Sequence, residues 1–262
     1  MDANGSAWTR LEQELDNWDR AGSVATLWWR DDDAAAVTDE LERLLDLQRQ
    51  FEAPLCLAVI PKLADGALAA RLEGTQRIHA AVHGYCHLNH ASQGEKKAEF
   101  GAHRPIETMK SEIADAWEKV RTLFGERAVP AFVPPWNRMT NELCPHLPRL
   151  GLRALSRKAP RRLADQPGRI PSPGLSVADV HVDIADWQGT RGFIGESEAL
   201  TQLCDCLRTR RLAHEASPTG VLTHHAVMDE PSWKFLARLF AETAENGRVC
   251  WLSAPEAFSL AE

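Results

Sequence analysis

Long apolar runs are missing from this chain, and no stretch approaches the roughly 18 consecutive apolar residues that a membrane-spanning helix needs. Residues 1–18 are acidic and mixed, with neither a basic flank nor an apolar signal core, so we expect no cleaved secretion signal. Long clusters of lysine and arginine are also missing. Together with a formal net charge of −7, this argues against nucleic acid and anionic membrane surfaces as partners. We therefore expect a cytoplasmic protein.

Cysteine pairs at metal-binding or redox spacing are missing as well. The six cysteines include no C-x-x-C pair, so we interpret them as reduced and mostly buried thiols. Cys86 is the exception, because it lies between two histidines where a thiolate could bind a metal or be oxidised.

Nucleotide-binding motifs are the third absence. Neither G-x-G-x-x-G nor a P-loop follows the first apolar segment. Apolar segments alternate with amphipathic ones seven or eight times, which indicates parallel strands covered by helices. Without a dinucleotide motif, and with reactive residues around the whole chain, an α/β barrel fits better than an open doubly wound sheet. We expect strands at residues 24–29, 55–60, 76–82, 129–133, 152–155, 177–182, 220–223 and 248–252.

Helices are predicted between these strands. Thr38 is a suitable N-cap for the helix that follows the first strand. The Pro- and Arg-rich residues 158–174 are expected to be irregular rather than a domain boundary. The other helices are predicted at residues 7–20, 63–72, 108–124, 141–150, 198–211 and 231–245.

Polar clusters follow directly on five of the predicted strands. In a parallel α/β barrel the carboxyl ends of the strands gather at one face, where active sites are built. Each cluster has a simpler explanation, such as a helix cap or a strand terminator, but five of them at equivalent positions favour one shared pocket. The clusters are residues 31–33, 83–90, 134–138, 183–187 and 224–225.

The cluster at residues 83–90 holds three histidines. His83 and His87 are four positions apart, a spacing that places both rings on one face of a helical turn, with Cβ atoms about 5–6 Å apart. Neutral imidazole is a favoured zinc ligand, and two histidines with one carboxylate leave a coordination position free for water. For an isolated H-x-x-x-H, a pair of surface or capping histidines would be the better interpretation.

In their order along the chain, these clusters resemble the motifs of the polysaccharide deacetylase superfamily. The resemblance covers roughly residues 24–252. It implies a distorted (β/α) barrel with about seven parallel strands, which we expect to span residues 1–262 as a single domain with a helical extension at 1–22. The matching segments are Asp32-Asp33, His83 with His87, Pro134-Pro135-Trp136, residues 183–187 ending in Trp187, and Leu222-Thr223-His224.

The resemblance also implies the metal site and the catalytic groups. Asp33, His83 and His87 would bind one divalent ion, with zinc expected and cobalt or nickel as alternatives. Asp32 would be the general base that takes a proton from the attacking water. His224 would be the general acid, with Asp186 or Asp183 beside it.

Substrate contacts are expected from the third and fourth motifs. A backbone N–H near Trp136 would stabilise the developing oxyanion. The faces of Trp136 and Trp187 could stack on a sugar ring, and Asn137 and Arg138 follow in the same segment. His90 is a further candidate for substrate contact. Supporting a metal ligand by a hydrogen bond, or capping a helix, is at least as good an interpretation.

Two departures from the family pattern affect the base. The third motif usually opens with an arginine that holds the base aspartate, and here that position is Val133; the glycine that usually follows the acid pair is Ala34. The replacement cation would be Arg30, Arg104 or Arg138, among which spacing does not choose. Asp31/Asp32 is an alternative register for the acid pair, and His225 could replace His224 as the acid.

The predicted function is hydrolytic removal of an acetyl group from an N- or O-acetylated sugar or a related small amide. This substrate is the main binding partner that we expect. Val133 motivates the alternative of a non-catalytic relative that binds carbohydrate or metal. A metal-dependent hydrolase of another C–N amide bond is the third alternative, because fold resemblance does not fix the substrate. Homo-oligomerisation is left open.

Overall fold

All the strands pair in parallel in the computed structural model, which describes residues 3–159, 172–244 and 247–260. The sheet order is β6-β5-β4-β3-β2-β1-β8-β7, and β9 pairs with the first half of β1. The strands are β1 (Ala25–Ala34), β2 (Leu55–Val59), β3 (Ile78–His83), β4 (Ala128–Val133), β5 (Ala154–Leu155), β6 (Ser176–Val177), β7 (Val180–Asp183), β8 (Thr219–Thr223) and β9 (Val249–Leu252).

The two ends of this sheet approach each other. A parallel bridge joins Lys158, just after β5, to Val180 at the start of β7. The backbone N–H of Ala159 donates to Val180 O at 2.8 Å. The sheet therefore curls into a distorted α/β barrel, which confirms the predicted fold class.

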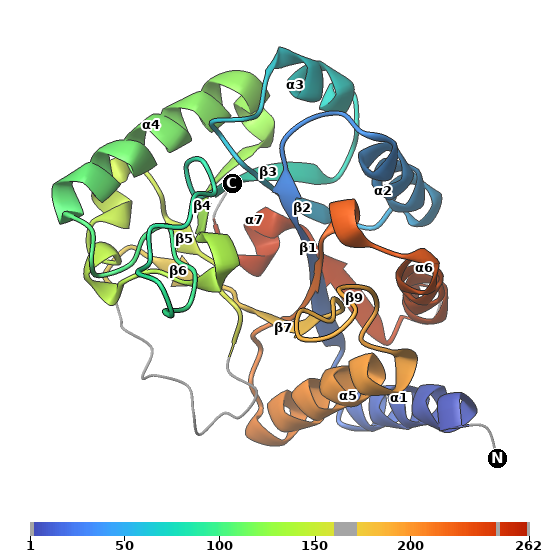
Figure 1. The fold of residues 1–262 in the computed structure, drawn as a ribbon. Helices are drawn as coiled ribbons and strands as arrows, with labels where there is room; N and C mark the ends of the chain where they lie inside the picture. Colours follow the sequence, from blue (N-terminus) through green and yellow to red (C-terminus); the bar gives the residue numbers. More distant parts are fainter. Residues whose placement is uncertain (1–2, 160–171, 245–246, 261–262) are drawn as a thin grey trace.

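Helices α1 to α6 surround this sheet on its outer side, whereas α7 lies at one end of the barrel interior (Figure 1). Among the described residues, no helix has both the length and the apolar character needed to cross a membrane. The helices are α1 (Ala3–Arg20), α2 (Asp39–Phe51), α3 (Gly66–Leu72), α4 (Ile106–Phe124), α5 (Glu196–Ala213), α6 (Glu230–Ala244) and α7 (Ala254–Ala257).

Local sequence explains where several helices begin. Thr38 caps α2 as predicted, its hydroxyl accepting from the Leu41 backbone N–H at 3.2 Å. Asp65 caps α3 in the same way. In α4 the predicted apolar face is buried, including Met109 and Ile113, because residues three and four apart share one side of a helix.

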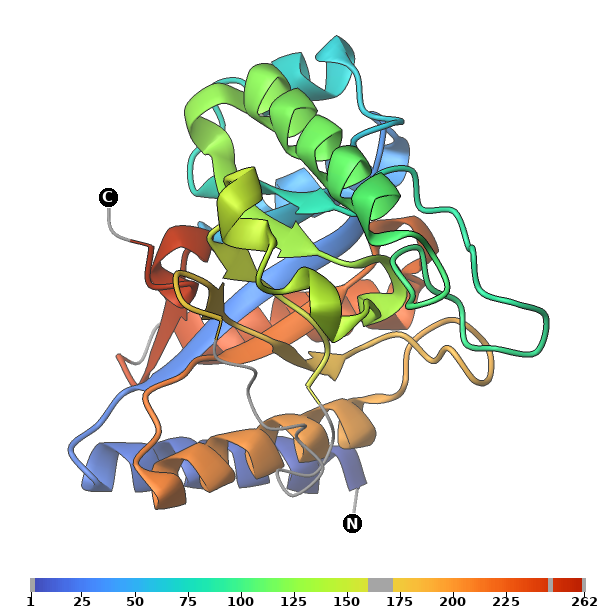
Figure 2. The ribbon, with the colours of Figure 1, turned by 90° about the vertical axis from the view of Figure 1, so that its left-hand side faces the viewer.

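The core is divided by the alternation of strand side chains. Outward-facing residues such as Trp29 pack against α2, α4 and α6. The barrel interior contains Trp28 and several small residues. Phe258, beside α7, covers the lower end of the barrel, and its ring centroid lies 5.4 Å from that of Trp28. Figures 1 and 2 show α7 at that end, while the loops after β3 and β7 extend from the opposite end.

Helices α1 and α5 run side by side below the sheet (Figure 2). Leu11 and Leu15 of α1 contact the apolar face of α5 in a separate cluster. Arg211 forms a two-pronged ion pair with Glu14, at 2.7 and 3.0 Å.

Two predicted elements are each divided into two in the structure. The helix predicted at 141–150 is instead two 3₁₀ turns, Asn141–Leu143 and Leu147–Leu150, because Pro148 lacks the N–H that an α-helix interior needs. The strand predicted at 177–182 is divided into β6 and β7. Of the irregular segment predicted at 158–174, residues 160–171 lie outside the described chain.

The first strand is longer than predicted, because β1 continues through the acidic cluster to Ala34. Asp31 faces outward and is fully buried. Its carboxylate accepts from the Thr223 hydroxyl at 2.6 Å and from the His225 backbone N–H at 3.0 Å, and it pairs with the His225 ring. Because each charge has a partner, the strand can carry these residues inside the fold.

We predict that Asp31→Asn lowers the free energy of unfolding by about 3 kcal/mol, because it leaves the buried His225 ring without its charge partner. Urea denaturation measures this. Glu230→Gln is the matched control: it removes a carboxylate from an exposed ion pair with Arg43, and we expect a change within about 1 kcal/mol. Equal effects from the two substitutions would contradict the assigned role of Asp31.

Candidate metal centre

Asp33 reaches the candidate metal centre through a bulge in β1. The pairing with β2 advances three residues on β1, from Asp31 to Ala34, against two on β2. Asp33 has φ 71°, in the left-handed region that non-glycine residues rarely adopt. A bulge of this kind re-aims a side chain, so the adjacent Asp32 and Asp33 can both serve one site.

His83 is the last residue of β3 and is almost completely buried. Its Nδ1 lies 3.0 Å from Val133 O, and its Nε2 lies 3.0 Å from Asp33 Oδ1. A backbone carbonyl on one ring nitrogen fixes the tautomer, which leaves the other nitrogen to bind a metal.

His87 completes the group from the loop after β3. Its Nε2 is 3.1 Å from the same Oδ1 of Asp33, and the centroids of the His83 and His87 rings are 5.2 Å apart. The prediction that these histidines share a helical turn is wrong: the chain leaves β3 as a loop in which Gly84 and His87 both have positive φ. The two rings converge through this loop geometry.

The donor atoms of Asp33, His83 and His87 all lie within 4.8 Å of one another. Burial alone raises the pKa of Asp33, but hydrogen bonds from the two imidazoles outweigh it and hold the pKa well below its usual range. Two nitrogens aimed at one carboxylate oxygen need positive charge between them, either as protons or as a shared cation. This set of donors fits a divalent ion such as zinc.

A second carboxylate, Asp32, lies beside this group inside the barrel. Arg30, two residues earlier on the same strand face, donates from Nη2 to Asp32 Oδ2 at 2.9 Å. The Nε of Arg30 lies 2.8 Å from Oδ1 as an ion pair without hydrogen-bond alignment. Of the three candidate arginines, only Arg30 contacts Asp32 among the described residues: Arg104 pairs with Glu112, and Arg138 donates to Lys97 O.

The geometry also distinguishes the two histidines after β8. His225 is held outside the barrel by Asp31, whereas His224 Nε2 lies 3.9 Å from Asp32 Oδ2. His224 is buried, and its Nδ1 has no hydrogen-bond partner among the described residues. The acid pair facing the histidines is therefore Asp32/Asp33, with His224 the imidazole beside it.

The fourth motif contacts His224 through an aromatic ring. The Trp187 ring meets His224 edge to face at 4.7 Å, and its indole N–H donates to Asp183 Oδ2 at 2.9 Å. Lys158 Nζ lies 3.2 Å from the same oxygen. Asp186 instead accepts from three backbone N–H groups of its own loop, at residues 188–190, so its catalytic role stays a prediction.

The predicted substrate contacts surround the centre with different exposures. Trp136 packs against His87 at 4.3 Å between ring centroids. Asn137 is turned inward, and its Oδ1 accepts from Arg30 at 2.6 Å. Arg138, Trp187 and His90 are exposed. Their contacts with a substrate stay predictions.

Glu99 is a buried residue that the sequence patterns did not single out. Its carboxylate accepts from the backbone N–H groups of Tyr85 and Cys86, at 3.2 and 2.8 Å, and so holds the loop between His83 and His87. Burial and the neighbouring Glu99 raise the pKa of Cys86 to about 11, which keeps it a thiol. Glu99 lies fourteen residues after Tyr85, and no sequence motif indicates a contact between a carboxylate and a backbone N–H at that distance along the chain.

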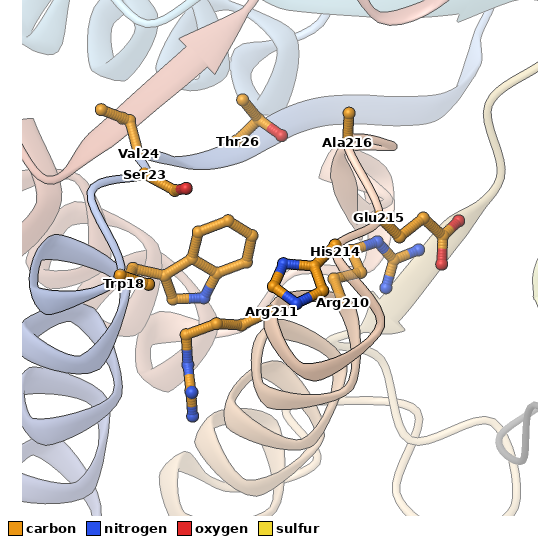
Figure 3. A pocket seen from close by; sticks show the side chains of 10 residues that line it. Trp18, Ser23, Val24, Thr26, Arg210, Arg211, His214, Glu215 and Ala216 are labelled. Atoms are coloured by element: carbon orange, nitrogen blue, oxygen red, sulfur yellow. The ribbon is translucent and has the colours of Figure 1, made fainter.

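A cavity of about 240 Å³ lies between α1 and α5, near the start of β1 (Figure 3). Trp18, Arg210 and Arg211 line it, but both arginines have partners: Arg210 donates to Ser217 O, and Arg211 pairs with Glu14. Since it lies at the amino ends of the strands, it is separate from the metal centre.

Comparisons with known proteins show the fold of this chain. No family model and no curated protein matches the sequence. A structure assigned as a polysaccharide deacetylase from Mycobacterium smegmatis is similar with a TM-score of 0.63 and 16% identity, covering 89% of this chain and 88% of the other.

Two further solved structures have the same fold. The Bc1960 peptidoglycan N-acetylglucosamine deacetylase has a TM-score of 0.57 and 14% identity, covering 91% of this chain and 90% of its own. A family 4 acetyl xylan esterase from Clostridium thermocellum, in complex with a cobalt ion, has a TM-score of 0.52 and 13% identity, covering 90% and 91%.

We predict that the purified protein binds about one equivalent of zinc or cobalt per chain, and that Asp33→Ala and His83→Ala each abolish this binding, since the remaining two ligands form an incomplete site. Competition with a chromophoric chelator measures the affinity. His103→Ala, which changes an exposed histidine, should bind as wild type does. Unchanged affinity in the Asp33 and His83 variants would rule out this centre.

We predict that Gly84→Ala destabilises the protein more than Gly94→Ala does. Both glycines have positive φ, which costs alanine about 1–2 kcal/mol. Only at Gly84 would the new Cβ also meet Glu99 Oε2 at 2.2 Å and Pro135 Cγ at 2.5 Å, which adds about 1–3 kcal/mol of overpacking. Equal unfolding midpoints in urea would disprove the tight packing of the ligand loop.

Proposed function

We propose that this chain is a member of the polysaccharide deacetylase superfamily: a metal-dependent hydrolase that removes an acetyl group from an N- or O-acetylated sugar or a related small amide. One observation carries the proposal. Separate strand ends place Asp33, His83 and His87 together. A second carboxylate, Asp32, and a further imidazole, His224, lie next to them and are not among the proposed ligands.

Zinc is the ion we propose, with cobalt or nickel as alternatives, because two imidazoles and a carboxylate are a frequent catalytic zinc set. When bound, the ion would polarise the acetyl carbonyl and lower the pKa of a coordinated water. Asp33, His83 and His87 are the residues that would hold it. The fixed ring of His83, with Val133 O on its other nitrogen, favours this over a flexible surface pair.

Asp32 is the proposed general base. Its carboxylate is almost completely buried and is held by Arg30, so its position is fixed relative to Asp33. In that position it would accept the proton of the attacking water as the new C–O bond forms. A base that does not spend its lone pairs on the metal remains available for this proton transfer.

His224 is the proposed general acid. Its Nε2 faces the site within 3.9 Å of Asp32 Oδ2, and Trp187 packs against its ring. It would donate a proton to the departing nitrogen or oxygen as the C–N or C–O bond breaks, releasing acetate and the free amine or alcohol. Asp183 would orient Trp187 and thereby the imidazole.

A sugar is the substrate class best supported around this centre. Trp187 presents an exposed ring at the mouth, and Trp136 lies beside His87; aromatic faces of this kind suit a sugar ring. One structural neighbour is a peptidoglycan N-acetylglucosamine deacetylase and another an acetyl xylan esterase, so an N-acetyl or an O-acetyl group is proposed. Hydrolysis of another C–N amide bond is the second candidate.

The non-catalytic alternative depended on Val133, where the base-holding arginine of the family is missing. The contact of Arg30 with Asp32 weighs against that alternative, because an arginine of its own strand, β1, holds the proposed base. We also propose that the protein acts in the cytoplasm on a soluble precursor or small conjugate, given that all six cysteines are free. Recovery of the native protein outside the cell would remove this second proposal.

We predict that chelation abolishes deacetylation of a panel of acetylated sugars and that zinc or cobalt restores it. Asp32→Asn should lower kcat by about 100-fold or more, the usual effect of losing a general base, while metal content stays at the wild-type value. Acetate release and metal analysis measure both quantities. Full activity after chelation would reject the proposed mechanism.

A further inference from the structure

Arg30 is an arginine inside the barrel with no exposed surface. Among the described residues, its guanidinium has three polar partners, each near the end of a different strand. Nη1 donates to Ser156 Oγ at 2.6 Å, after β5, and Nη2 donates to Asn137 Oδ1 at 2.6 Å, after β4. The third partner is Asp32 on β1 itself, with contacts at 2.9 and 2.8 Å.

Of these partners only Asp32 carries a charge that can balance the buried guanidinium. A buried arginine and a buried aspartate each need such a partner, because an unpaired charge in the interior is very costly. Several interior residues on the other strands are small, namely Cys56, Ala58, Ala81, Ala131 and Ala154. They leave room for the arginine beside Leu222, the residue of β8 that is in register with Arg30.

Val133 faces the same interior. It is fully buried among those small residues, in register with His83 on the neighbouring strand. Its backbone carbonyl still serves the metal centre, accepting from the Gly84 backbone N–H at 3.0 Å and lying 3.0 Å from His83 Nδ1. Its side chain supplies no charge.

We propose that Arg30 is the positioning residue of this centre, supplying from β1 the guanidinium that holds the base Asp32, in place of the arginine expected at Val133 on β4. The inference rests on the proposed function, since it gives Asp32 the role of base. The role follows from alternation: residues 30 and 32 share one face of the strand, so a single element presents the base and its support.

Arg30 also joins the base to the loop after β4. Asn137 has φ 57° and Trp136 φ 53°, two consecutive non-glycine residues in the left-handed region. The bond from Arg30 to Asn137 Oδ1 holds this turn next to His87, against which Trp136 packs. Loss of Arg30 would therefore displace the base and loosen the loop beside it.

The decisive experiment exchanges the two positions. Arg30→Met, Arg30→Lys, Val133→Arg and the double variant Arg30→Met/Val133→Arg are compared with wild type in acetate release. Arg71→Met is the control, because it removes an arginine that forms a similar two-pronged pair with Glu42 on the outer helices. Cobalt content, the visible spectrum of bound cobalt and the unfolding midpoint are recorded for every variant.

We expect Arg30→Met to lower kcat by about 100-fold or more, on the scale of losing the base itself, with KM and cobalt content near wild type. Arg30→Lys should keep part of the activity, and Val133→Arg should restore at least tenfold in the Arg30→Met background. Arg71→Met should leave kcat unchanged. If Arg30→Met keeps wild-type kcat, or loses it only together with bound cobalt, the positioning role is overturned and the proposed function stands.

A separate readout keeps the outcomes distinct. If wild type binds cobalt and releases no acetate from any substrate in the panel, the proposed function fails. The pairing is then tested by stability. Arg30→Met/Asp32→Asn should unfold at a higher urea concentration than Arg30→Met, because it also removes the carboxylate charge left without a partner. An equal or lower midpoint for the double variant would overturn the pairing.

Discussion

Charge pairing along one buried strand is the constraint on which this structure depends. β1 carries four consecutive charged residues from Arg30 to Asp33 through the middle of the sheet, and the first three are almost completely buried. A buried charge is tolerated only with a partner. Arg30 and Asp32 pair with each other, and His225 pairs with Asp31. Further hydrogen bonds come from distant segments: Ser156 and Asn137 on the inside, and Thr223 on the outside. The strand thus fixes the relative positions of segments far apart in sequence.

The two faces of β1 have different tasks. Inward, Arg30 and Asp32 form the support and the proposed base of the centre. Outward, the Asp31 carboxylate contacts both the backbone N–H and the ring of His225, in the segment after β8. Because His224 precedes His225 directly, the outward contact also determines where His224 lies inside the barrel. A structural ion pair and the proposed acid are therefore coupled through one peptide unit.

Much of the fold could be predicted from the sequence. Apolar runs and helical periodicity located most strands and helices, and the order of polar clusters indicated which strand ends meet. The exceptions have physical causes. The acidic residues of β1 look unsuited to a buried strand because their partners are distant in sequence, and the helix predicted at 141–150 contains Pro148, which favours short 3₁₀ turns.

At the centre, the sequence indicated which residues gather but not how they do so. Asp33, His83 and His87 come together as expected, yet through a bulge and a glycine loop rather than a helical turn. Spacing could not choose among Arg30, Arg104 and Arg138, since the choice depends on which face of a strand each side chain occupies. Glu99 escaped notice because its role is to accept backbone N–H groups, and such a role has no sequence motif.

The bulge at Asp33 has a consequence for how such chains diverge. Three neighbouring aspartates look interchangeable by composition, but each faces a different environment: the outer layer, the barrel interior and the mouth of the site. Deleting Asp31 would move Asp32 to the outward-facing position and Asp33 into the interior position, so neither would keep its present contacts. We therefore expect substitutions in this triplet to be tolerated better than deletions. A sequence alignment shifted by one residue would assign each aspartate the role of its neighbour.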